Sequence, residues 1–367
     1  MDIAYNESER LIRDAARAFL ADAVPIAIVA AAGRSGEFPR ALWRSIAEQG
    51  WFGAGTPAEH GGAGSTLVEW ALVLEEMGRV ACPGPVVEQL AAGVYLATIG
   101  ARERLDGVLS GETVVSIAVQ DQPGAPVTAA ADRRTLTGAK MLVPYAQGAD
   151  LLLASADDGA RRGYYAVDPR AAGVAIAPLH TVSRDQHGLV TLDRAAAAHL
   201  ADVDADPRRD LYEIYRLARD AYAVGLIGRM LDMTLEFVKQ REQFDQPIGA
   251  FQAVQYRCVD IALAFYGAQT QLYQAAWLLQ SGRPATRELL ICHAQIRTAA
   301  GEAVAHAHQS HGAMGFTSEY PLHHFSRRAK AYQHGLGTVA ELRERIAQVE
   351  RDLPFPEADE PMWGGFF

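Results

Sequence analysis

Three histidines lie close enough along the chain to suggest a metal site. His306, His308 and His311 fall within six positions, and histidine nitrogen is a common ligand of zinc. In a helix, however, residues two and five positions apart point in different directions, so these side chains would not converge on one ion. The spacing is more typical of partly exposed histidines on a helix, and we expect no metal here.

A glycine-rich stretch could in principle cradle a phosphate group. Gly61, Gly62 and Gly64 lie close together. A phosphate-binding loop follows a strand and ends in Gly-Lys-Ser/Thr, and this stretch has neither feature. A tight connection between two helices is the better interpretation.

Hydrophobic periodicity predicts two helical regions on either side of a β-region. Residues 5 to about 112 carry apolar positions at helical spacing, with breaks at residues 57–64 and 82–85. Six short β-type runs separated by turn residues then predict a small antiparallel β-domain. These runs are Thr113–Val119, Thr135–Val143, Leu151–Ala154, Tyr164–Val167, Val174–Ala177 and Leu189–Leu192.

After about Asp206 the helical period returns. Apolar residues recur every three or four positions over 214–238 and over 251–279, which predicts two long helices with one apolar seam each. Two further helices are expected, at about 286–309 and around 339–349, and four such helices make a bundle. The predicted fold class is α+β, with an N-terminal α-helical domain over 1–112, a central antiparallel β-domain over 113–205 and a C-terminal four-helix bundle over 206–367.

The composition limits the class of protein. The chain has 367 residues, of which 49% are hydrophobic, enough for a large core and more than one lobe. Charges interrupt every apolar stretch before ~18 positions, so no membrane span is expected, and the N-terminus lacks the features of a secretory signal. Cys82, Cys258 and Cys292 lie far apart, which favours a reducing cytoplasm. The net charge of −10 disfavours nucleic-acid binding, because phosphate backbones attract basic faces.

Three stretches resemble the signature motifs of acyl-CoA dehydrogenases, in the order in which that family carries them. The first is Thr56-Pro-Ala-Glu-His-Gly-Gly-Ala-Gly64, with Glu-Glu-Met-Gly-Arg79 after it. The second is Arg241-Glu-Gln-Phe-Asp-Gln-Pro-Ile248, followed by Phe251-Gln252. The third is Gln309-Ser-His-Gly-Ala-Met-Gly315, followed by Glu319-Tyr-Pro321 and Arg327. The resemblance implies the acyl-CoA dehydrogenase fold, with the same three regions as above, and an FAD-dependent oxidation of acyl-CoA thioesters.

The resemblance also implies a shared cofactor. In this family the second and third motifs of one subunit hold the ADP half of the FAD that sits in a neighbouring subunit. Arg241 would offer several donors to a pyrophosphate, and Gly312 would let backbone N–H groups approach closely. The FAD contacts carried over in this way are Arg241, Gln243, Phe244, Gln309, Gly312 and Ala313, the last standing where the family has a second glycine.

The catalytic base of the family is missing. Its members remove the α-proton of the thioester with a glutamate while the flavin accepts a hydride from the β-carbon. Many members carry that glutamate before a Gly-Thr pair, where this chain has Leu336; others carry it near the start of the bundle's first helix, where this chain has Arg216. Neither side chain can accept the proton. Some members have an arginine near CoA at the second position, so Arg216 is an expected substrate contact.

The segments that face the flavin have changed as well. The family's T-E-P-G-A-G-S loop corresponds to residues 121–127, where Asp121 and Val127 replace the hydroxyl residues. A carboxylate there is unfavourable near an anionic cofactor unless it is neutralised. The following W-I-T corresponds to Leu142-Val-Pro144, and proline removes a backbone donor. By contrast, the motifs that serve a neighbour's FAD are mostly kept, with Asp245 in place of a glycine as the chief exception.

This asymmetry predicts the non-catalytic subunit of a heteromeric (α2β2) acyl-CoA dehydrogenase, of the type known in actinobacterial steroid degradation. The expected partners are a homologous catalytic subunit that shares its FAD, an acyl-CoA substrate and an electron-transfer flavoprotein. Two alternatives stay open. One is a homomeric acyl-CoA enzyme that uses His334 or Asp121 for non-redox chemistry such as hydration. The other is a scaffold subunit without a cofactor.

Overall fold

The N-terminal part of the molecule is helical, as predicted. The computed structural model describes residues 5–35 and 37–352. Two helices begin with capping boxes: in the second, the Thr66 hydroxyl accepts from the Glu69 amide at 3.1 Å, and the Glu69 carboxylate accepts from the Thr66 amide at 2.7 Å. The helices are α1 (Glu7–Ala23), α2 (Ile26–Ser35), α3 (Arg40–Glu48), α4 (Leu67–Arg79), α5 (Val86–Thr98) and α6 (Arg102–Leu109).

The central region is a sheet of eight strands. All six predicted strands are present, and the structure adds two short ones, β2 and β8. In chain order the strands are β1 (Val115–Ala118), β2 (Thr128–Ala129), β3 (Thr135–Pro144), β4 (Leu151–Asp157), β5 (Arg162–Val167), β6 (Val174–Leu179), β7 (His187–Ala196) and β8 (Ala198–Asp202). The spatial order is β6-β7-β3-β2-β4-β5-β8, with β1 also paired to β4.

The sheet is mixed, and this refines the prediction of an antiparallel domain. Most neighbouring strands are antiparallel, but β1 and β2 run parallel to β4. The backbone N–H of Val115 donates to the Gln89 side chain of α5 at 2.9 Å, and that of Val114 to Asp150 at 3.1 Å. These contacts hold β1 beside β4 from outside the strand. Alternation of apolar residues predicts a strand but not the direction of its partner.

The C-terminal region consists of three long helices and two shorter ones. They are α7 (Leu211–Gln240), α8 (Gln252–Ser281), α9 (Thr286–His311), α10 (Leu322–His334) and α11 (Val339–Asp352). The four predicted helices are confirmed, and α10 is additional. Its sequence is mainly polar and basic, yet it buries Phe325, Arg328 and Ala329 against the neighbouring helices. Leu322, Phe325 and Ala329 recur at helical spacing, so the sequence does carry a signal for this helix, which the prediction of four helices did not include.

Helices α4 and α7 cross at unusually close range. A Cβ atom added to Gly225 would lie 1.9 Å from the Glu75 carbonyl oxygen, and one added to Gly78 would lie 2.0 Å from that of Tyr222. Only glycine allows two backbones to approach so closely. The crossing fixes the N-terminal helices onto the C-terminal ones, and the apolar side chains of both regions form one core with one face of the sheet.

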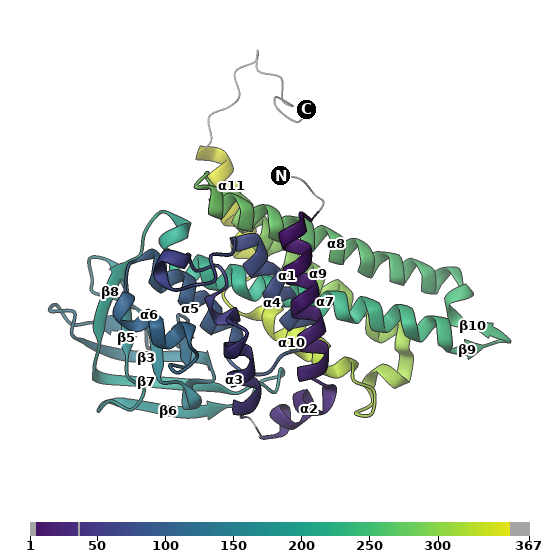
Figure 1. Cartoon of the computed structure of the whole chain (residues 1–367), viewed down its shortest axis with the longest axis horizontal. Coiled ribbons are helices and arrows are strands. Elements are labelled where there is room, and N and C mark those ends of the chain that lie inside the picture. The colour runs from purple at the N-terminus through teal and green to yellow at the C-terminus, as the bar shows by residue number, and fades with distance from the viewer. Residues whose placement is uncertain (1–4, 36, 353–367) are drawn as a thin grey trace, which may run out of the picture.

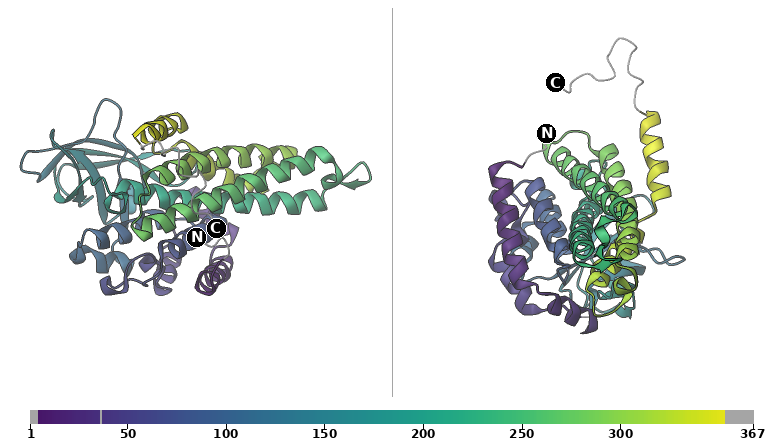
Figure 2. Two further views of the ribbon diagram at one scale, coloured as in Figure 1. Left: turned by 90° about the horizontal axis from the view of Figure 1, so that it is seen from above. Right: turned by 90° about the vertical axis from the view of Figure 1, so that its right-hand side faces the viewer.

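The sheet and the free end of the bundle lie at opposite ends of the molecule. Figure 1 shows the strands at one end and the small hairpin β9 (Glu242–Gln243) and β10 (Gln246–Pro247) at the other, with α7 and α8 running between them. The view from above in Figure 2 shows the same elongated arrangement. Among the described helices, none alone is long and apolar enough to cross a membrane; α1 and α2, bent by 65° at their junction, pass that test only together.

Candidate functional site

A cavity of about 230 Å³ lies where the sheet meets α5, α7 and α10. Leu142 and Pro144 of β3 line its sheet side, and Leu336, in the loop after α10, lines the opposite side. The structure therefore brings together positions that the sequence separates by almost 200 residues. The cavity is the place where the family resemblance puts the reacting groups.

Leu336 is held firmly in this cavity wall. Its side chain is 6% exposed, and its φ of 59° is a left-handed conformation that leucine seldom adopts. The carbonyl oxygen of Leu336 accepts a hydrogen bond from the Tyr212 hydroxyl and another from the Arg297 guanidinium, each at 3.1 Å. Arg297 also donates to the carbonyl oxygen of Gly337. The loop thus presents an apolar side chain at the position where other members carry the base.

Arg216 lies on the other side of the same loop. It is 2% exposed, and its Nη1 donates to both carboxylate oxygens of Glu213, at 3.2 and 3.3 Å. Its Nε and Nη2 have no hydrogen-bond partner in the described part of the chain. Arg216 and Leu336 line a second hollow, of about 420 Å³. The two alternative base positions of the family are therefore neighbours here, and neither carries an acceptor.

Sequence reasoning missed the acidic group beside Arg216. Glu213 accepts from His293 at 3.2 Å, and the other nitrogen of His293 contacts Asp220. Burial acts to raise the pKa of Glu213, but the hydrogen bond from His293 and the charge of Arg216 outweigh it and hold that pKa at about 2. Such a carboxylate is a poor proton acceptor near neutral pH. The spacing of Glu213, Arg216 and Asp220 on one helical face could have revealed this network.

Asp121 is neutralised. Its carboxylate accepts from Lys140 Nζ at 2.5 Å and from Arg162 Nη2 at 3.1 Å, and Lys140 also donates to the Ser155 hydroxyl at 2.9 Å. Burial acts to raise the pKa of Asp121, but the hydrogen bond from Lys140 and the charges nearby outweigh this effect, and the pKa is lowered overall. The sequence-based concern about an unpaired carboxylate near an anionic ligand is therefore removed. The same pairing weighs against Asp121 as a catalytic base, because its charge is already engaged.

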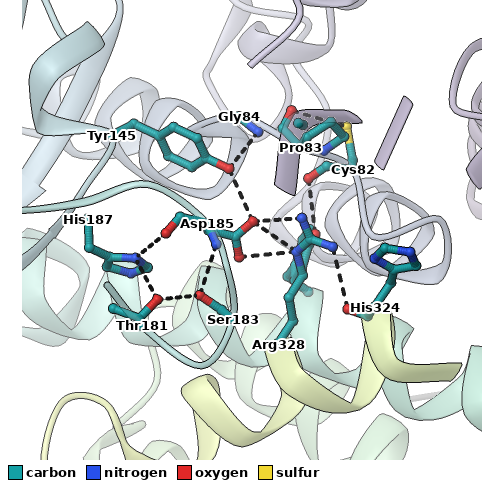
Figure 3. A network of polar contacts seen from close by, with 12 residues as sticks. Cys82, Pro83, Gly84, Tyr145, Thr181, Ser183, Asp185, His187, His324 and Arg328 are labelled. Carbon is teal, nitrogen blue, oxygen red and sulfur yellow. Dashed lines mark hydrogen bonds and ion pairs between the residues drawn. The ribbon is translucent and has the colours of Figure 1, made fainter. Parts of the chain in front are cut away.

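A buried polar network closes one wall of the cavity (Figure 3). Arg328 of α10 donates from Nε and Nη2 to the carboxylate of Asp185, which lies in the loop between β6 and β7, at 2.6 to 3.1 Å. The Tyr145 hydroxyl donates to Asp185 at 3.3 Å and accepts from the backbone N–H of Gly84 at 3.0 Å. His187 contacts the Asp185 carbonyl oxygen at 3.0 Å. The network joins the sheet, α10 and the turn before α5.

The residues predicted to contact FAD gather far from this cavity. Helices α7 and α9 end side by side, since the Phe237 ring lies 4.4 Å from that of His311. The members of this distal cluster are Arg241, Gln243, Phe244, Gln309, Gly312 and Ala313, and all are exposed. Helix α7 has 30 residues and so is about 45 Å long. These side chains therefore lie at the solvent-exposed end of the bundle and cannot reach the chain's own cavity.

The hairpin that carries part of the distal cluster has a tight turn. Phe244 and Asp245 have φ values of 57° and 60°, the pattern of a two-residue turn with both central residues left-handed. Aspartate tolerates this conformation better than most residues, which explains how Asp245 can replace a glycine. Phe244, at the tip, is 87% exposed. The turn holds this aromatic ring out into solvent.

FAD fits the two regions differently. In the distal cluster, the Arg241 side chain is exposed, and Gly312, with a φ of 57°, has nothing within 4 Å of where a Cβ would stand. A cation beside an open backbone cradle suits a pyrophosphate. In the chain's own cavity, the backbone of Pro144 lacks an amide hydrogen, and the side chain of Leu142 has no polar group. The distal cluster fits the ADP half of the cofactor, whereas the cavity does not fit the flavin ring well.

Comparison with known proteins agrees with this geometry. Residues 6–109 match the acyl-CoA dehydrogenase N-terminal domain, and residues 212–350 match the C-terminal domain. The chain is 32% identical to the acyl-CoA dehydrogenase FadE27 of Mycobacterium tuberculosis, over 86% of this chain and 90% of that one.

Solved structures agree as well. The ChsE4-ChsE5 complex from M. tuberculosis superimposes with a TM-score of 0.90 at 26% identity, over 97% of this chain and 100% of that one. A variant of the Tcur3481-Tcur3483 steroid ACAD superimposes with a TM-score of 0.88 at 28% identity, over 94% of this chain and 98% of that one. The chain therefore belongs to the acyl-CoA dehydrogenase family.

Proposed function

We propose that this chain is the non-catalytic subunit of a heteromeric acyl-CoA dehydrogenase, assembled as α2β2 with a homologous catalytic subunit. The observation that carries the proposal is the separation of two sets of residues. Leu336 and Arg216 leave the chain's own site without a base. Arg241 and Gly312, at the opposite end of the bundle, remain open for a cofactor held elsewhere. A subunit that serves a neighbour and not itself has this arrangement.

In the assembled enzyme each subunit contributes different groups. The family consists of FAD-dependent oxidoreductases that act on the CH–CH bond of acyl-CoA thioesters, and the flavin accepts the hydride. The partner supplies the glutamate and the surroundings of the flavin ring. Arg241 binds the pyrophosphate by charge-assisted hydrogen bonds, Gln243 and Gln309 donate to the phosphate or the adenine edge, and Gly312 lets backbone amides approach. Arg216, with two free nitrogen atoms, contacts the CoA thioester end in this chain's own site.

An exposed apolar surface supports the presence of a protein partner. Tyr256, Val259, Leu263 and Tyr266 recur at spacings of three and four on α8 and are 52 to 68% exposed. Phe244, Met314 and Phe316 add exposed apolar area at the distal end. Contiguous apolar side chains on a surface usually mark an interface. We assign this stripe and the distal cluster to the contact with the catalytic subunit, whose FAD then lies next to Arg241.

The relatives suggest the substrate class and the electron acceptor. One of the two similar solved structures is the ChsE4-ChsE5 complex. The other is the Tcur3481-Tcur3483 steroid ACAD. We therefore propose a bulky acyl-CoA, such as a steroid side-chain thioester, as the substrate. An electron-transfer flavoprotein is the proposed acceptor of the electrons. For the alternative of non-redox chemistry in a homomer, Asp121 is ion-paired to Lys140 and Arg162, which weighs against it as the base, whereas His334 lines the cavity and stays the candidate.

The test is to purify this chain alone and together with its homologous catalytic subunit. We expect the flavin absorbance and acyl-CoA oxidation only in the mixture. In this chain, Arg241→Ala should release FAD from the complex without preventing assembly. Arg343→Ala is the matched control, since Arg343 is also exposed but lies on α11, outside the distal cluster. Yellow, active protein from this chain alone would refute the proposal, and a colourless complex that still assembles would favour a scaffold.

A further inference from the structure

The helical wall of the central cavity carries a cation without a matching anion. Arg219 lies on α7 and lines the cavity. Its guanidinium carbon lies 4.6 Å from the ring centre of Tyr332 and 5.6 Å from that of Tyr215. Within the described residues, no carboxylate is within ion-pair distance of this guanidinium. The aromatic rings orient the group, but they do not supply the full negative charge that a carboxylate would.

Several other polar groups of the cavity already have partners. Asp185 is bound by Arg328, and the Tyr215 hydroxyl donates to Glu88 at 2.7 Å. The Tyr222 hydroxyl donates to the carbonyl oxygen of Cys82 at 3.0 Å. Of the two cations that line the cavity, Lys330 donates to Gln333 at 2.8 Å, whereas the half-buried Arg219 has no carboxylate within ion-pair distance among the described residues. A ligand carboxylate would therefore add an ion pair at Arg219.

The charges around the cavity leave a positive excess. The cavity is lined by two carboxyl groups, those of Asp185 and Glu88, and by two cations, Arg219 and Lys330. A third cation, Arg328, lies directly behind Asp185 and is paired with it. Burial raises the pKa of Glu88, and the hydrogen bond from Tyr215 only partly opposes this effect. An anionic ligand would neutralise the remaining charge.

The opposite side of the cavity is apolar. Its sheet-side lining consists mainly of Ile117, Val119, Met141, Leu142 and Pro144. Such a surface favours the burial of a hydrocarbon chain. A volume of about 230 Å³ is smaller than the usual range for drug-sized ligands. We propose that this cavity binds a small apolar carboxylate, with its chain against the sheet side and its carboxylate on Arg219.

Gly335 positions the cation. A Cβ atom at this residue would lie 2.5 Å from Arg219 Nη2, so the absence of a side chain lets the guanidinium rest against the loop that leads to Leu336. The φ of Gly335 is −87°, which alanine also adopts. Gly335→Ala therefore displaces the guanidinium while keeping its charge. The proposed function assigns Arg216, in the neighbouring hollow, to the CoA end of a thioester. The carboxylate site on Arg219 goes beyond it, because it requires neither CoA nor flavin.

The test uses the full chain and two probes of equal length, octanoate and octan-1-ol, measured by isothermal titration calorimetry. Octanoate should bind, and Arg219→Gln should weaken its binding at least tenfold, as expected for the loss of a charge-assisted hydrogen bond. Gly335→Ala should weaken it less. Binding of octan-1-ol should stay unchanged in both variants. Arg283→Gln is the control, because Arg283 also stacks on an aromatic ring, that of Trp277 at 5.5 Å, but does not line the cavity.

The outcomes separate this proposal from the function proposed above, since neither probe requires flavin or a partner. Far-ultraviolet circular dichroism checks that each variant is folded. If Arg219→Gln fails to fold, the comparison of Gly335→Ala with the unmodified chain still decides. Absence of octanoate binding to the folded chain, or equal octanoate binding in folded Arg219→Gln, would overturn the proposal. So would tighter binding of octan-1-ol than of octanoate.

Discussion

A buried glutamate in the core makes the stability of the protein depend on pH. Glu75 lies on α4 and is 3% exposed. Its carboxyl group accepts from the Tyr273 hydroxyl of α8 and from Gln269 Nε2 at 2.8 Å, and the Tyr5 hydroxyl donates to that of Tyr273 at 3.2 Å. Burial is the largest influence and raises the pKa of Glu75 from 4.5 to about 7, although the bond from Tyr273 acts to lower it.

The direction in which the stability changes with pH follows from the binding of a proton to Glu75. Because the folded state holds the proton of Glu75 more tightly than the unfolded chain, this group contributes most to stability below about pH 4.5. The contribution falls as the pH rises through about 7 and is constant above that. At 1.36 kcal/mol per pKa unit, the difference between the two plateaus is about 3 kcal/mol.

The substitution Glu75→Gln tests this reasoning. Glutamine keeps an oxygen that accepts from Tyr273 but cannot ionise. We expect Glu75→Gln and the unmodified protein to differ little in the free energy of unfolding at pH 5. At pH 9 the variant should be more stable by about 3 kcal/mol. Urea titrations followed by circular dichroism at the two pH values measure the difference.

Glu76→Gln is the control. Glu76 is also buried on α4 but is bound by Arg17 at 2.6 and 2.9 Å. Its substitution should destabilise the protein at both pH values, because it removes an ion pair. If Glu75→Gln changed the stability equally at pH 5 and pH 9, Glu75 would not change its protonation state in this range and the reasoning would be wrong.

Three further predictions concern the packing and the site. Gly225→Ala should cost about 3 kcal/mol or prevent folding, because the added methyl group collides with α4; an unchanged melting temperature would contradict this. Arg328→Met should cost about 3–5 kcal/mol in the free energy of unfolding, since it leaves Asp185 buried without its cation, and Asp185→Asn in the same chain should restore part of the loss. Leu336→Glu should leave the chain alone colourless and inactive toward acyl-CoA, because Pro144 is unchanged; flavin-linked oxidation by that variant alone would refute the division of labour.

Most of the helices and strands could be predicted, because the local spacing of apolar residues and the turns between them indicate where each element lies. The apolar seams of α7 and α8 follow from spacing alone, and each of the longer strands appears as a short apolar run between turns. Helix α10 has an apolar pattern of its own, but the burial of Arg328 on it could not be predicted, because it depends on the pairing with Asp185 far away in the chain. The parallel pairing of β1 with β4, and the anchoring of β1 to Gln89 of α5, are contacts that no strand pattern includes. Both features arise from contacts between distant segments.

The sequence by itself determined which chemical groups are missing and which are present. Leucine at 336 and arginine at 216 cannot accept a proton wherever they lie, and Arg241 carries its charge in any setting. Only the tertiary structure decided that Leu336 and Arg216 flank one loop, while Arg241 stands at the far end of α7. It also pairs Asp121 with Lys140 and Arg162, whereas it places no carboxylate within ion-pair distance of Arg219 in the part of the chain that the structure describes. The covalent structure defines what a side chain can do, whereas burial and neighbouring charges decide its protonation state and what it can reach.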